Sequence, residues 1–255
     1  MYPDQPAEAE ELYDEADRLL GGFIMIRLLD FLAFFLEWGY VFVFINLIHT
    51  FLPLRENIFM RLAALLAGGA VFTAIIYSND LAGLIGALLG LCVYIAVFHC
   101  GHWAEKITAV LVFYPAFIAM NFLMQDIGSR CFFFVTQAPE SISLGWTDEQ
   151  LLTSTAFYIL SLFLRLLFWI LAWLVLRKVL KQAVLNLTIK MWFVTDILML
   201  APFTAVFTMI YFMPDNSGIA YPICGASLFS SFGCMYLVSY LSESMRTAYY
   251  AQELE

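Results

Sequence analysis

The chain has 255 residues, of which 63% are hydrophobic and 13% are charged, and its formal net charge is −9. A soluble domain of this size has about a quarter charged residues, so the composition argues against a water-soluble protein. The acidic balance argues against nucleic acid as a partner, because the phosphate backbone attracts basic surfaces. We therefore expect the lipid bilayer to surround most of the chain.

The first 22 residues form an acidic leader. Seven of the first 17 residues are acidic: Asp4, Glu8, Glu10, Glu11, Asp14, Glu15 and Asp17. The segment lacks the basic start of a signal peptide, so we treat it as part of the mature chain. We expect a solvated, loosely helical leader.

Seven apolar segments follow between residues 23 and 241. They run over about 25–51, 59–77, 81–98, 107–125, 151–176, 191–213 and 219–241. Crossing a hydrocarbon core takes roughly 20 helical residues. Apolar and polar residues do not alternate as barrel strands require. The sequence therefore predicts an all-α integral membrane bundle of about seven transmembrane helices.

The basic residues predict the orientation of the bundle. Alternate loops hold eight of the twelve Lys and Arg residues: Arg55, Arg61, Lys106, Arg177, Lys178, Lys181, Lys190 and Arg246. The loops of opposite parity hold only Arg130. Because basic loops stay in the cytoplasm, we expect the N-terminus outside and the C-terminus inside a plasma membrane.

The predicted spans contain ionisable residues, among them Glu37, Arg165 and Asp196, and a charge there is costly unless it is paired or hydrated. Glu37 and Arg165 have opposite signs and lie at similar depths in the first and fifth spans. A direct pair between them is one hypothesis, and such a pair would serve equally well as a structural clamp. Asp196 lies early in the sixth span, within reach of Lys190 or water.

The longest predicted outer loop covers residues 126–150 and is rich in aromatic residues. It contains Phe132, Phe133, Phe134 and Trp146. These residues suit an interfacial segment resting on lipid headgroups, or an apolar rim for an extracellular ligand. Thr147 and Gln150 have the spacing of a capping box and predict a helix start there.

Nothing in the sequence indicates catalysis or a cofactor. Walker A, GxSxG, HExxH and dinucleotide-binding motifs are absent. The five cysteines include no CxxC pair. The stretch His99-Cys100-Gly101-His102 has no second cluster to complete a metal site, so we expect a solvated loop and no bound metal.

The last span continues into a polar helix over residues 242–255. Val238, Leu241, Met245 and Ala248 follow one another at 3-4-3 spacing, which is typical of a coiled-coil face. That face predicts a homodimer. Because the sequence ends inside this helix, we expect a sensor module whose output domain lies beyond it.

This layout resembles the membrane sensor region of the Agr-type receptor histidine kinases, whose cytoplasmic part carries a GHKL ATPase domain. The matching features are Glu37 in an early span, the LPLRENIF loop, the basic LRKVLKQAV loop and the exit helix ESMRTAYYAQELE. The resemblance implies a receptor that detects an extracellular signal, often a peptide, and passes it inward through the last helix. The phosphoacceptor histidine, the Asn-rich box and the Gly-rich lid of a kinase are absent from this chain.

Two other functions remain open at this point. A small transporter or permease would use Glu37, Arg165 and Asp196 as a polar path through the bundle. A structural or assembly protein of the membrane would bind no ligand.

Overall fold

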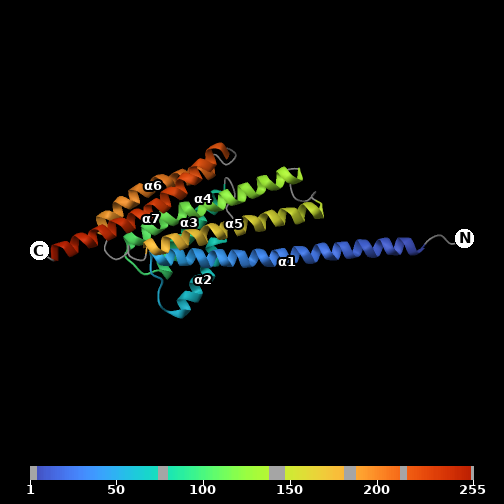
Figure 1. The fold of residues 1–255 in the computed structure, drawn as a ribbon, viewed down its shortest axis with the longest axis horizontal. Coiled ribbons are helices and arrows are strands. Elements are labelled where there is room, and N and C mark those ends of the chain that lie inside the picture. Colours follow the sequence, from blue (N-terminus) through green and yellow to red (C-terminus); the bar gives the residue numbers. More distant parts are fainter. Residues whose placement is uncertain (1–4, 74–79, 138–146, 181–187, 213–216, 254–255) are drawn as a thin grey trace. The chain divides into compact units, whose positions relative to one another are not determined.

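The computed structural model describes residues 5–73, 80–137, 147–180, 188–212 and 217–253, and regular structure within these ranges is helical (Figure 1). The helices are α1 (Gln5–Phe51), α2 (Ile58–Phe72), α3 (Leu81–Phe98), α4 (Trp103–Thr136), α5 (Asp148–Leu180), α6 (Ile189–Phe212) and α7 (Ser217–Glu253). The predicted all-α class is confirmed.

Six of these helices are long and apolar enough to cross a membrane. Their candidate spans are Ile24–Phe51, Leu81–Phe98, Trp103–Thr136, Glu149–Lys178, Ile189–Phe212 and Gly218–Met245. The remaining helix, α2, is apolar but has 15 residues, which rise about 22 Å against a hydrocarbon core of about 30 Å. The chain is thus a multi-pass helical membrane protein. The end of the predicted second span, from residue 74, lies outside the described residues.

Short polar side chains fix the starts of α2 and α3. The Asn57 side chain accepts a hydrogen bond from the backbone N–H of Phe59 at 3.0 Å. The Asp80 side chain accepts one from the N–H of Gly83 at 2.8 Å. These bonds satisfy N–H groups that have no partner within the helix.

The start of α5 is a capping box, as its sequence predicts. The Thr147 hydroxyl accepts from the Gln150 N–H at 3.3 Å, and the Gln150 side chain accepts from the Thr147 N–H at 3.0 Å. Two N–H groups of the first turn are thereby satisfied reciprocally.

Two helices extend further than their sequence suggests. Helix α1 begins at Gln5, so the acidic leader is continuous with the first span. Helix α4 continues to Thr136, so the predicted loop is wrong for residues 126–136. An i,i+4 ion pair of 2.7 Å between Arg130 and Asp126 bridges this part of α4.

Backbone contacts divide the chain into two compact units. The first comprises residues 1–37 and 125–164, and the second comprises residues 38–124 and 165–255. The buried apolar cluster belongs to the second unit.

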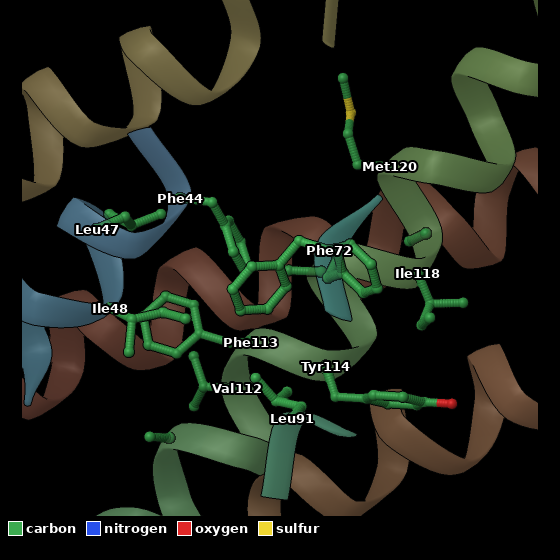
Figure 2. Packing of buried hydrophobic residues seen from close by; sticks show 14 of the residues in the cluster. Phe44, Leu47, Ile48, Phe72, Leu91, Val112, Phe113, Tyr114, Ile118 and Met120 are labelled. Carbon is green, nitrogen blue, oxygen red and sulfur yellow. The ribbon is translucent and has the colours of Figure 1, made fainter. Parts of the chain in front are cut away.

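Aromatic side chains from separate helices form the centre of that cluster. Phe44 of α1 has its ring centroid 4.8 Å from Phe72 of α2 and 5.9 Å from Phe113 of α4 (Figure 2). It also lies 4.7 Å from Trp169 of α5. All of these contacts are edge-to-face, the arrangement that aromatic rings prefer. In α4, residues 112–122 are all buried, so this helix is surrounded within the second unit.

The loops that follow α1 and α3 lie side by side. The Arg55 N–H donates to the Phe98 carbonyl at 3.0 Å, and the Cys100 N–H donates to the Pro53 carbonyl at 2.8 Å. These bonds make an isolated antiparallel bridge between the two loops. The ends of α1 and α3 therefore share one side of the bundle, as the distribution of basic residues predicts for these loops.

Candidate functional site

Arg165 lies near the middle of the apolar span of α5 and is held by side chains from two other helices. Its Cζ atom lies 4.2 Å from the ring centroid of Tyr40 on α1. Its Nη1 donates a hydrogen bond of 3.0 Å to Oδ1 of Asn121 on α4. Tyr40 and Asn121 are buried, and Arg165 is half-buried. A cation–π contact and a charged hydrogen bond together hold the guanidinium inside the bundle.

Three buried donor groups in this neighbourhood have no hydrogen-bond partner among the described residues. They are Nε of Arg165, the hydroxyl of Tyr40 and the indole Nε1 of Trp169. Trp169 follows Arg165 by one helical turn, and Phe44 contacts both aromatic rings, with centroid distances of 4.7 Å to Trp169 and 5.9 Å to Tyr40. The Arg165 cluster, defined here as Arg165, Asn121, Tyr40 and Trp169, thus combines a positive charge with an excess of donors.

Asp196 has a different environment on α6. Its Oδ1 accepts a hydrogen bond of 2.5 Å from the Thr108 hydroxyl of α4. Thr108 is fully buried, and Asp196 is half-buried. The sequence suggests Lys190 or water as the partner of Asp196, whereas the structure provides a neighbouring hydroxyl. This carboxylate therefore has a donor from the chain itself.

Glu37 has a partner in the first unit. Its Oε1 accepts a hydrogen bond of 2.6 Å from the Tyr158 hydroxyl of α5. The structure therefore gives Glu37 and Arg165 separate hydrogen-bond partners. Their direct pairing stays a prediction.

The aromatic residues expected on a loop lie on the last turns of α4. Phe132 is 4% exposed and Phe134 is 85% exposed, with Phe133 between these values. Consecutive helical residues point in different directions, so these three side chains do not form one continuous rim. Trp146 lies outside the described residues. Ligand binding by this segment stays a prediction.

The signalling face predicted on the last helix is only partly available. Val238 is fully buried in the core of the second unit. The same apolar periodicity suits a bundle core and a coiled coil, so a face for a second copy stays a prediction. Leu241 and Met245 are half-buried. The side chain of Ala248 lies outside the described residues.

The His99–His102 stretch does not form a uniformly solvated loop. His99 is fully buried, and its Nδ1 lies 2.9 Å from the Leu52 carbonyl. Burial lowers the pKa of His99 to about 4, and the hydrogen bond to Leu52 opposes this shift. Cys100 and His102 are exposed. Across the described ranges, no group of three or more His, Cys, Asp or Glu side chains is arranged to hold a metal ion.

Sequence reasoning finds the charges in the membrane but misses the groups that surround them. Asn121 has a detectable signal, because it is a polar amide within a long apolar run. Thr108, Tyr40 and Trp169 have none, because such residues are common in membrane helices.

Comparisons with models of protein families, with curated proteins and with solved structures gave no match. Function is therefore inferred from the architecture and the side-chain geometry.

Proposed function

We propose that the chain is the sensor of a receptor in the plasma membrane. It detects an extracellular signal, a peptide or a small molecule, and passes a conformational change through α7 to a cytoplasmic output domain. The resemblance to Agr-type sensor regions supports this proposal, and so does the layout of α7.

The continuity of α7 is the observation that carries the proposal. The helix extends over 37 residues, which corresponds to about 55 Å and exceeds the thickness of the hydrocarbon core. Pro222 lies near its start, and residues 234–253 contain neither Gly nor Pro. Met235 and Val238 are buried in the bundle core. A change in core packing around these two residues can therefore reach the last residues of the helix, which extend beyond its candidate span.

A small transporter is the second candidate function. Arg165 and Asp196 both lie within candidate spans, and intramembrane charges commonly mark ion or substrate paths. Transport predicts uptake or efflux that depends on these two residues, whereas sensing predicts an output that depends on α7.

Fusion of residues 1–255 to a dimeric histidine-kinase core distinguishes the two functions. Residues are inserted one at a time after α7, and kinase output is measured for each insertion. A rigid transmitting helix predicts an output that rises and falls with a period of about seven residues. An output that ignores the length of the insertion would contradict the sensor proposal.

Disulfide scanning tests the homodimer that this proposal includes. Leu241→Cys and Met245→Cys are expected to cross-link two copies, because these residues are half-buried on the predicted face. Val238→Cys is the control and is expected not to cross-link, because Val238 is fully buried within its own bundle. Absence of cross-linking at both test positions would remove the α7 dimer from the account.

A further inference from the structure

We propose that the Arg165 cluster is a binding site for an organic carboxylate inside the helical bundle. This site does not rest on the signalling role of α7, since it concerns binding alone.

The charge and geometry of Arg165 suit a carboxylate. Its Nη1 is used by Asn121 at 3.0 Å, while Nε is buried without a partner among the described residues. Nε belongs to the side edge of the guanidinium, which can hold a carboxylate through two parallel hydrogen bonds. Arg165 therefore has a guanidinium edge whose Nε has no acceptor among the described residues, and such an edge suits a planar anion.

The groups that neighbour Arg165 in the cluster are hydrogen-bond donors. The Tyr40 hydroxyl and the Trp169 indole N–H are fully buried and have no partner in the described part of the chain. An indole N–H only donates, and a hydroxyl can donate. Because buried polar groups normally have partners, the cluster calls for an added acceptor. A cation is disfavoured by the fixed positive charge.

The surroundings of the cluster are apolar and suit an organic ligand. Trp169 contacts Phe168 and Phe232, with centroid distances of 5.4 and 6.4 Å. Such rings accommodate the hydrocarbon part of a carboxylic acid and offer no hydration to a second charge. A singly charged organic carboxylate therefore fits better than inorganic phosphate.

A second arginine on the same helix provides a matched comparison. Arg177 lies over the Trp173 ring at 5.3 Å, so it also makes a cation–π contact. Arg177 is exposed near the end of the span, where water can solvate it. Arg177 therefore tests whether any arginine stacked on an aromatic ring lets a carboxylate stabilise the chain.

The experiment measures the melting temperature of the full chain in detergent micelles with sodium benzoate. Benzamide at the same concentration and constant ionic strength is the uncharged control. Benzoate is expected to raise the melting temperature with the logarithm of its concentration, and benzamide is not. The rise should disappear in Arg165→Gln and persist in Arg177→Gln. Tyr40→Phe and Trp169→Phe should each reduce it.

Arg165→Lys provides a second variant in case Arg165→Gln does not fold. Lysine keeps the charge but lacks the planar edge, so a reduced rise is expected. An equal rise in wild type and Arg165→Lys would overturn the proposal. So would the absence of a rise with benzoate in the wild-type chain. Either result would leave the proposed role of α7 standing.

Discussion

Two charged residues of the second unit, Asp196 and Arg165, differ in how their hydrogen-bonding capacity is used. Asp196 receives a hydrogen bond from Thr108 on the neighbouring α4, so a donor of the chain serves its negative charge. Arg165 donates to Asn121, yet further donors around it have no acceptor among the described residues. One environment is balanced in donors and acceptors, and the other has an excess of donors.

This difference shows why the presence of a charge in a membrane span does not by itself indicate a function. A charge costs free energy in lipid until its hydrogen-bonding capacity is used. The chain provides Asp196 with a donor from Thr108, which suits a structural contact between α4 and α6. Around Arg165 it leaves buried donors without an acceptor among the described residues, which suits a ligand.

The largest expected effect is on cysteine labelling, which reports the orientation of the membrane bundle that contains both sites. The native Cys100 and Cys131 are exposed, and the predicted topology places them inside and outside, respectively. A membrane-impermeant maleimide should label Cys131 in intact cells and Cys100 only after permeabilisation. Cys131→Ala and Cys100→Ala identify which residue carries the label. Labelling of both residues in intact cells would contradict the orientation.

His99 gives an intermediate case, with one ring nitrogen paired and Nε2 unpaired within the described residues. Its pKa falls from the usual 6.5 to about 4 in the folded protein. The unfolded chain therefore binds more protons between these values. The contribution of neutral His99 to the free energy of unfolding should be fully present above about pH 6.5. It should decline as the pH falls toward 4, by at most about 1.4 kcal/mol per pH unit.

Melting temperatures measured between pH 7 and pH 5 test this dependence. The variant His99→Gln should lose most of the slope, because glutamine does not titrate. His102→Gln is the control, since His102 is exposed and its loss should leave the slope in place. If His99→Gln left the slope of melting temperature against pH unchanged, other titratable groups would be responsible for the pH dependence.

Removal of the Thr108 hydroxyl tests the balanced site. Thr108→Val takes away the donor of Asp196 and should destabilise the protein by about 2 kcal/mol, the scale of a hydrogen bond to a charged group. Thr195→Val is a matched control. Thr195 is also buried on a helix, and its hydroxyl bonds the Met191 carbonyl at 3.0 Å, as the Thr108 hydroxyl bonds the Ala104 carbonyl at 3.0 Å. Among the described residues the Thr195 hydroxyl has no carboxylate partner. If thermal or denaturant unfolding showed the same loss of stability in Thr108→Val and Thr195→Val, the hydrogen bond from Thr108 to Asp196 would contribute nothing to stability.

The sequence predicts six of the spans because long apolar runs have one stable solution in lipid. The second predicted span corresponds to α2, whose 15 residues are shorter than a membrane span. The sequence also predicts the capping box at Thr147, which depends on residues three apart. It does not predict that α4 continues through Asp126 and Arg130, because an i,i+4 ion pair lets charged residues remain helical. Helix ends are therefore less predictable than helix centres.

The side-chain partners could not be predicted because they depend on which helix faces meet. Asn121 and Arg165 are 44 positions apart, and Thr108 and Asp196 are 88 apart. The burial of Val238 has the same origin, since an apolar stripe does not state which surface covers it. Periodicity identifies a face, and only packing identifies its partner.

The excess of donors around Arg165 is tested most directly by removing one tyrosine hydroxyl at a time. Tyr40 and Tyr114 are both fully buried, but Tyr114 donates to the Leu84 carbonyl at 2.8 Å, whereas the Tyr40 hydroxyl has no partner among the described residues. Without added carboxylate, Tyr40→Phe should raise stability and Tyr114→Phe should lower it, each by about 1 kcal/mol. Melting temperatures in micelles should then move in opposite directions. A loss of stability in Tyr40→Phe as large as that in Tyr114→Phe would contradict the account.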